Sequence, residues 1–295
     1  SSHIGHRLFW SGAHSTGTFT FKIMKLAISP CPNDTYIFHW MIHNPEGPGF
    51  EPVYLDIQEL NEEARAGRYE LSKMSCYAYL KLKDKYTLLE TGGALGRGCG
   101  PLLVGSARSQ HKDPESLLRH LAESQSPILI PGQETTATLM LRMYMDQRNL
   151  TIPLQFLRYD RILPALQEGS HEAGVIIHEE RFTYPSFGAW MLQDLGQWWE
   201  QTTGSPIPLG LIAIRNDRLN QKERITEIIR DSLKHANEDP ESAMDYIRSH
   251  AQAMEDQAIR DHIALYVNDY SLDMGEEGRH AMQELEQRAR NAGAL

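Results

Sequence analysis

The chain has 295 residues, of which 41% are hydrophobic and 23% are charged, and its formal net charge is -10. This composition is typical of a soluble globular protein, and no apolar run approaches the roughly 20 residues that a membrane-spanning helix requires. The chain is acidic and contains no block of Lys and Arg residues, so we expect neither a nucleic acid nor a membrane as a partner. An anionic small molecule would need a local cluster of hydrogen-bond donors.

The cysteines and the N-terminal stretch indicate the compartment. Cys31, Cys76 and Cys99 have none of the spacings of a zinc, disulfide or haem motif. We interpret them as ordinary thiols in a reducing, cytoplasmic environment.

Residues 1–23 contain no Asp or Glu and lack the apolar core of a secretory signal. We interpret them as an extension left by recombinant expression, with a transit peptide as the alternative.

The first regular segment begins at residue 24. The apolar run 25–29 (KLAIS) predicts a strand, and the turn residues up to Asp34 followed by TYIFHWMIH predict a capped helix. A helix over 61–66 ends at Gly67, and the strand that follows, 69–74, places Lys73, Met74 and Ser75 at its carboxyl end.

A second copy of this pattern follows. An apolar run at 127–130, the turn PGQETTA and a helix over 138–147 repeat the first arrangement. A helix stopped by Gly169 then precedes the strand 173–177, which places His178 at its end. Asn33 precedes Lys73 by about 40 positions and Thr136 precedes His178 by about 42, which favours two lobes built on one plan.

We therefore predict an α/β protein with two lobes, each a mixed, mostly parallel sheet flanked by helices, with the ligand cleft between them. The apolar segments 101–104 and 209–214 are predicted to be strands that cross between the lobes. On this interpretation residues 24–103 and 210–295 form the first lobe and 104–209 the second. The glycine run GGALGRGCG is expected to give backbone freedom at the hinge.

Both copies place polar groups where such sheets bind ligands, beyond the carboxyl ends of their strands. The segments SPCPNDT and PGQETTA carry Asn33, Thr135 and Thr136 beside helix N-termini, where they can hold a carboxylate or a phosphate. The alternative is that Asn33 and Thr135 only cap helices.

His178 ends a nearly all-apolar strand and is the best candidate for a general base, because histidine accepts a proton near neutral pH. A purely structural role is the alternative. Glu179 or Glu180 could orient its ring, unless both are solvated. Lys73 is expected at the equivalent edge of the first lobe, where a surface position is the default. We favour a cation that holds substrate charge over an amine nucleophile, because nothing nearby indicates the burial that a nucleophile requires.

Several classes of site are disfavoured. The glycine run contains neither GxGxxG nor GxxxxGK[ST], and the chain has no HExxH, CxxC or GxSxG. We expect no bound metal and no nucleotide. Trp190, Trp198 and Trp199 could stack on an aromatic ligand, but packing is the favoured interpretation.

Eight ordered segments carry a resemblance to a known family. They are SPCPNDTYIFHW, LSKMSCYAY, ETGGALGRGCGPL, PGQETTA, RYDRILPALQEG, AGVIIHEERFTYP, LGQWWEQTTGSPIPLG and YVNDYSLDMGEEG. Over residues 24–278 the chain resembles the 1,4-dihydroxy-6-naphthoate synthases of the futalosine route to menaquinone. The resemblance implies a fold like the type II periplasmic binding proteins and a lyase that cleaves cyclic de-hypoxanthine futalosine without a cofactor. We expect the protein to be a monomer or a homodimer. It places the catalytic base at His178 and substrate contacts at Lys73, Met74, Ser75, Thr135 and Thr136.

Two alternatives remain open. A non-catalytic protein that binds a small carboxylate would use the same lobes. A chorismate dehydratase of the same pathway resembles this architecture as well, although the segments VIIHE and SPCPNDT favour the synthase.

Overall fold

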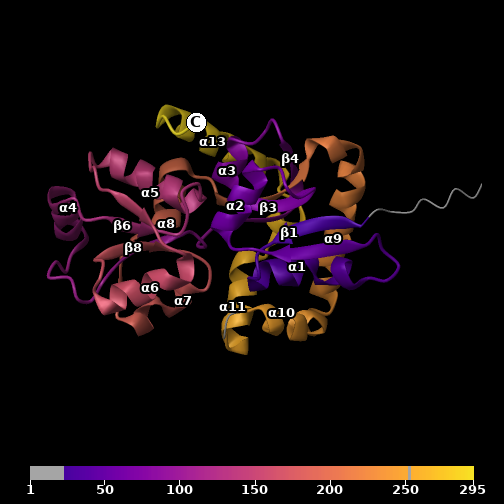
Figure 1. The fold of residues 1–295 in the computed structure, drawn as a ribbon, viewed down its shortest axis with the longest axis horizontal. Coiled ribbons are helices and arrows are strands. Elements are labelled where there is room, and N and C mark those ends of the chain that lie inside the picture. The colour runs from indigo at the N-terminus through magenta and orange to yellow at the C-terminus, as the bar shows by residue number, and fades with distance from the viewer. Residues whose placement is uncertain (1–22, 252–253) are drawn as a thin grey trace, which may run out of the picture.

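The computed structural model describes residues 23–251 and 254–295, and these form two sheets that lie side by side, each flanked by helices (Figure 1). The predicted N-terminal extension therefore lies outside the described residues, except for its last residue. None of the helices in the described ranges is both long enough and apolar enough to pass through a membrane.

The first sheet has the strand order β2-β1-β3-β10-β4. Its strands are β1 (Met24–Ile28), β2 (Phe50–Tyr54), β3 (Leu71–Ser75), β4 (Tyr86–Gly96) and β10 (Ile207–Arg215). β1 pairs in parallel with β2 and β3, whereas β10 is antiparallel to both β3 and β4.

The second sheet repeats this plan in the order β7-β6-β8-β5-β9. Its strands are β5 (Leu102–Gly105), β6 (Ile128–Ile130), β7 (Leu154–Phe156), β8 (Ala173–Ile176) and β9 (Trp190–Asp194). β6 is parallel to β7 and β8, and β5 is antiparallel to β8 and β9. Each sheet is thus half parallel and half antiparallel rather than mostly parallel, because one strand enters it from the direction of the other lobe.

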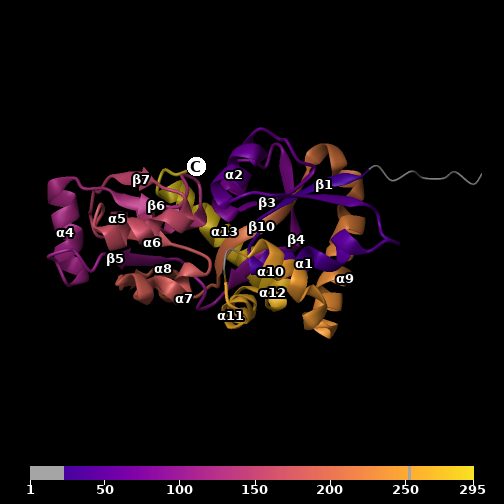
Figure 2. The same cartoon turned by 60° about the horizontal axis from the view of Figure 1, so that its bottom comes forward.

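The helices divide between the two lobes. Around the first sheet lie α1 (Pro32–His43), α2 (Ile57–Arg65), α3 (Cys76–Leu80), α9 (Lys222–Glu238), α10 (Met244–His250), α11 (Asp256–Tyr266), α12 (Asp269–Leu272) and α13 (Gly275–Asn291). Around the second lie α4 (Pro114–Ser124), α5 (Thr136–Gln147), α6 (Tyr159–Glu168), α7 (Glu180–Thr183) and α8 (Leu195–Thr203). In both views α13 runs along the junction of the lobes (Figure 2), and near its end the Ala294 carbonyl accepts a hydrogen bond from the Tyr77 hydroxyl.

Local sequence explains several helix ends. α2 begins with a capping box in which the Asp56 carboxylate accepts from the Glu59 N–H and the Glu59 side chain accepts from the Asp56 N–H. This box places the start of α2 four residues before the predicted helix. α6 ends at Gly169, which has a φ of 80°, as predicted for a left-handed cap.

The strands near the hinge do not cross between the lobes as predicted. β5 pairs only in the second sheet and β10 only in the first, so the chain crosses in the segments 97–101 and 204–206. In the first crossing, a Cβ on Gly100 would lie 2.2 Å from the Gly196 Cα. Gly100 is therefore required for close backbone packing against α8. Gly98, in the same crossing, has a φ of 70°, which agrees with the backbone freedom expected of this glycine run.

The three tryptophans pack within the second lobe. Trp199 is fully buried and donates to the Pro206 carbonyl, and Trp198 donates to the Gln147 side chain. Trp190 donates to the Ser106 carbonyl. The packing interpretation is confirmed, and none of the three lines the pocket between the lobes.

Candidate active site

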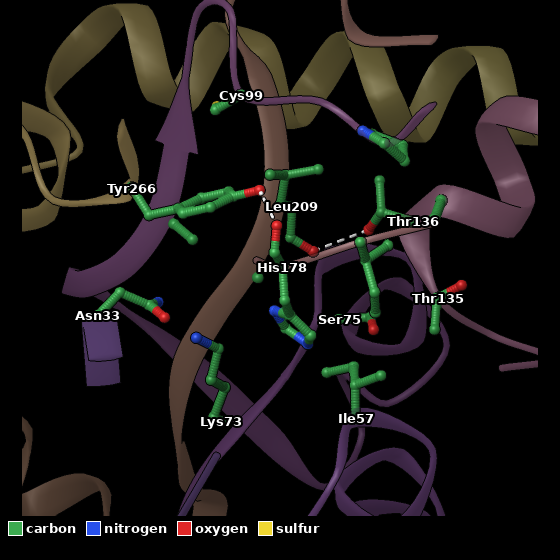
Figure 3. Close-up of a pocket in the computed structure, with 15 residues that line it drawn as sticks. Asn33, Ile57, Lys73, Ser75, Cys99, Thr135, Thr136, His178, Leu209 and Tyr266 are labelled. Atoms are coloured by element: carbon green, nitrogen blue, oxygen red, sulfur yellow. Dashed lines mark hydrogen bonds between the residues drawn. The ribbon is translucent and has the colours of Figure 1, made fainter. Parts of the chain in front are cut away.

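A pocket lies between the two sheets and is lined by residues from both (Figure 3). Its volume is about 70 Å³. The first lobe contributes residues of α1, α2, β3, β4 and β10, the second contributes the start of α5 and the two residues that follow β8, and α11 closes one side. The lining residues are Asn33, Ile57, Lys73, Ser75, Ala94, Cys99, Pro101, Thr135, Thr136, Ala137, Ile177, His178, Leu209, Gly210 and Tyr266.

His178 enters the pocket on a strained piece of backbone. It follows β8 with a φ of 57°, in the left-handed region that residues other than glycine rarely adopt. The Tyr266 hydroxyl donates to the His178 carbonyl oxygen at 3.3 Å, which ties this backbone to α11. The imidazole ring meets the Tyr159 ring edge to face, with 5.1 Å between centroids. Strain of this kind is maintained only where the surroundings enforce it, and it is common at functional sites.

The His178 imidazole is neutral at neutral pH. Burial and, to a smaller extent, the Lys73 ammonium together lower its pKa to about 4, although the Asp34 carboxylate partly opposes this shift. A neutral ring has one unprotonated nitrogen that can accept a proton. Within residues 23–251 and 254–295, neither Glu179 nor Glu180 forms a hydrogen bond with this ring, so the suggestion that one of them orients it is wrong.

Lys73 is buried, with only 5% of its side chain exposed, and it forms an ion pair with Asp34 at 2.6 Å. The Asp34 carboxylate is completely buried and also accepts from the Ser29 N–H at 3.0 Å and the Ser29 hydroxyl at 2.6 Å. The assumption that nothing nearby buries Lys73 is therefore wrong. The protonated amine that pairs with this carboxylate has no free lone pair, so it cannot act as a nucleophile. A role as a cation is therefore still favoured, but because of the ion pair and not because of exposure.

Asn33 does not cap α1, because the cap position is Cys31 and Asn33 lies within the first turn. Its amide nitrogen is 3.3 Å from Asp34 Oδ1, and its amide oxygen is 2.9 Å from Nε2 of His262 on α11. The amide thus belongs to a buried polar network that reaches the Lys73 ammonium through Asp34.

The two threonines differ in their roles. Thr135 caps α5, since its hydroxyl accepts from the Thr138 N–H at 3.1 Å. The Thr136 hydroxyl donates to the Leu209 carbonyl at 2.9 Å and accepts from the Tyr77 N–H at 3.2 Å, so it joins the second lobe to the first. The first N–H groups of α5 have no partner within the helix and lie at the pocket.

At the end of β3, successive side chains alternate between the two faces of the sheet, as strand geometry requires. Lys73 and Ser75 line the pocket, whereas the Met74 side chain is fully buried in the core and does not line it. Asn61 orients Ser75 by donating from its amide to the Ser75 hydroxyl and accepting from the Ser75 N–H, both at 2.9 Å.

Reasoning from the sequence missed three residues of this network: Asp34, Tyr266 and His262. Asp34 lies in the segment SPCPNDT that had already been singled out, and a buried Lys73 would have required such a partner. Tyr266 and His262 lie on the predicted C-terminal helices, and no local pattern distinguishes them from core residues.

The site residues offer no metal-binding cluster. No group of three or more His, Cys, Asp or Glu side chains in the described ranges is placed to hold a metal ion. The three cysteines are free and buried, and burial raises the pKa of Cys99, the one that lines the pocket, to about 12. This agrees with their interpretation as ordinary thiols.

Glu180 gives a prediction about stability. It is 6% exposed, its Oε2 has no hydrogen-bond partner in the described part of the chain, and burial and the neighbouring Glu179 raise its pKa to about 9. Because the pKa rises on folding, stability declines as pH increases from about 4.5 to about 9. Glu180→Gln should therefore stabilise the protein by on the order of 3 kcal/mol at pH 7 and by less at pH 5.

Urea unfolding at pH 5, 7 and 8.5 measures this effect, with the exposed Glu168→Gln as the matched control. An equal effect of Glu180→Gln at all three pH values would show that the carboxyl is ionised in the folded protein.

Comparisons with known proteins identify relatives of this chain. Residues 24–291 match the family model described as menaquinone biosynthesis. The chain is 44% identical to a 1,4-dihydroxy-6-naphthoate synthase from Thermus thermophilus, over 90% of this chain and 93% of the relative. It is 36% identical to a protein of the same name from Streptomyces coelicolor, over 92% and 94% of the two chains.

Solved structures extend the comparison to the fold. A crystal structure of a protein from Archaeoglobus fulgidus superimposes with a TM-score of 0.82 at 30% identity, covering 92% of this chain and 98% of the other. A Candida albicans protein described as having the generic periplasmic binding protein fold gives a TM-score of 0.66 at 11% identity, covering 93% and 91%. The fold is thus that of the periplasmic binding proteins. By the family match and the two close relatives, the chain belongs to the menaquinone biosynthesis family, among its 1,4-dihydroxy-6-naphthoate synthases.

Proposed function

We propose that this chain converts cyclic de-hypoxanthine futalosine to 1,4-dihydroxy-6-naphthoate, with His178 as the general base. The observation that carries the proposal is a neutral imidazole and a buried ammonium, brought from two lobes into one pocket. A carrier needs the cation and the donors to hold an acid, but it has no need of a strained, unprotonated histidine beside them.

Each group has a role in this reaction. The N–H groups at the start of α5 and the Ser75 hydroxyl bind the substrate carboxylate. His178 removes a proton from the sugar-derived ring and so triggers elimination. The Lys73 ammonium stabilises the negative charge that then develops on the substrate, and before the reaction it keeps the imidazole unprotonated. Asp34 holds this cation in place.

The reaction also requires motion of the lobes. A cavity of about 70 Å³ is far smaller than the pockets of roughly 300–1,000 Å³ that bind drug-sized ligands. We infer that the two lobes, which the chain connects through the segments 97–101 and 204–206, separate to admit substrate and close to exclude water. The lobe boundaries therefore fall a few residues before the predicted ones at 103 and 209, because β5 and β10 each pair within a single sheet. The Thr136 hydrogen bonds to Leu209 and Tyr77 are among those that opening would break.

The pH dependence of kcat/KM tests the role of His178. Because its pKa is lowered to about 4, the base form predominates above that pH. We expect kcat/KM to stay constant with respect to this group from about pH 5 upward and to fall about tenfold per pH unit below pH 4. A fall centred at pH 6.5 would show that the imidazole is not buried beside the Lys73 ammonium. Circular dichroism at each pH separates this effect from acid unfolding.

The direct test of the function is incubation of the purified protein with cyclic de-hypoxanthine futalosine, followed by detection of released naphthoate. Tight binding without release would support a carrier, and consumption of chorismate instead would support the dehydratase. The free thiols of the described residues are consistent with a cytoplasmic reaction. We expect a monomer or a homodimer.

A further inference from the structure

His262 is a buried histidine behind the pocket wall. It lies on α11, is fully buried and is not among the residues that line the pocket. Its Nε2 is 2.9 Å from the Asn33 amide oxygen, although the two residues are 229 positions apart. Asn33 does line the pocket, and Figure 3 shows it with Tyr266 on one side of the site, next to Lys73.

The neighbours of Asn33 determine the orientation of its amide. Asp34 Oδ1 accepts from the Lys73 ammonium at 2.6 Å and lies 3.3 Å from the Asn33 amide nitrogen. A carboxylate only accepts hydrogen bonds, so the NH₂ group of Asn33 must face it and the amide oxygen must face His262. His262 therefore carries its proton on Nε2 and donates it to Asn33.

The second ring nitrogen, Nδ1, indicates that the hydrogen bond from Nε2 to Asn33 is the only one that the His262 ring makes in the described part of the chain. Its Nδ1 is buried and has no hydrogen-bond partner in residues 23–251 and 254–295. A buried acceptor without a partner destabilises the fold, and an apolar side chain would avoid that cost. Burial, together with the nearby His178 and Lys73, holds the pKa of His262 well below its usual range, so the ring stays neutral.

We propose that His262 is a positioning residue for the reaction, because it holds the Asn33 amide in the one orientation in which it meets the substrate. With one N–H committed to Asp34 and the oxygen held by His262, the remaining N–H of the amide is available to a substrate oxygen. The same helix also fixes the base, since Tyr266, one turn after His262, bonds to the His178 carbonyl. This proposal rests on the proposed role of Asn33 as a substrate-binding residue.

The test compares His262→Leu, which removes the donor, with His262→Gln, whose amide nitrogen can replace Nε2. For naphthoate release from cyclic de-hypoxanthine futalosine, we expect His262→Leu to lower kcat/KM about 10- to 100-fold. His262→Gln should restore it to within about fivefold of the wild type. The decrease in Tm should not be proportional to this decrease in kcat/KM, because His262→Leu removes the unpartnered Nδ1 together with the donor.

A double-mutant cycle separates positioning from a general structural effect. In an Asn33→Ala background, His262→Leu should change kcat/KM less than about twofold, because its partner is already absent. If the effects of His262→Leu and Asn33→Ala on kcat/KM are fully additive, or if His262→Leu is as active as the wild type, the proposal is wrong. If His262→Leu does not fold, His262→Asn replaces it, since its amide is too short to reach Asn33, and the same loss is expected.

Binding of 1,4-dihydroxy-6-naphthoate by calorimetry keeps this test independent of turnover. His262→Leu should weaken product binding about tenfold, and only where Asn33 is present. Wild-type protein that binds the naphthoate but releases none from the substrate would contradict the proposed function, and weaker product binding by His262→Leu would then still support the positioning role. Unchanged product binding together with unchanged kcat/KM would contradict the positioning role alone.

Discussion

Replacing His178 with Asn should lower kcat by roughly 10³-fold, within the 10²–10⁴-fold range of general-base catalysis, while substrate binding and folding are retained. Asn is the informative replacement because, among residues other than glycine, it tolerates a φ of 57° well, and it has no basic nitrogen. Single-turnover release of naphthoate measures the loss, and product binding by calorimetry shows whether the pocket is intact.

His171→Asn is the matched control. His171 lies just before β8 and His178 just after it, so both substitutions affect the same strand at opposite ends. His171 bonds only to Ser170 and Gln155 in the described chain, and its substitution should leave kcat unchanged. Near-normal turnover of His178→Asn would place the proton transfer on another group and contradict the proposed mechanism.

Lys73→Met should decrease the free energy of unfolding by about 3–5 kcal/mol, because it leaves a completely buried Asp34 carboxylate without its partner cation. The Ser29 hydrogen bonds to that carboxylate remain but cannot neutralise its charge. Urea unfolding at pH 7 measures the change. The exposed pair Lys83–Glu286 gives the control, since Lys83→Met should cost at most about 1 kcal/mol.

A second substitution separates stability from function. In Lys73→Met with Asp34→Asn both charges are removed, so most of the lost stability should return. Turnover should remain low because the cation that stabilises developing charge is still absent. Recovery of turnover together with stability would show that Lys73 acts only through folding, and equal stability of Lys73→Met and wild type would show that Asp34 is not buried as an anion.

Much of the architecture follows from local pattern. The repeated strand, turn and helix, with Gly67 and Gly169 as left-handed caps, predicts the matching halves of the two sheets and places Lys73 and His178 at strand ends. The structure brings these two residues to one pocket. The antiparallel halves were not predicted, because the partners of β5 and β10 are set by pairing between distant segments.

By itself the sequence determined the two-lobed plan, the family and the placement of Lys73 and His178 near strand ends, because strand periodicity, cap residues and ordered motifs are local features of the chain. Only the tertiary structure decided that Lys73 is buried, that Asp34 is its partner, that Met74 faces the core and that His262 holds Asn33. Those facts depend on contacts between residues 39 and 229 positions apart. Burial and charge pairing exist only once the helices and sheets have packed.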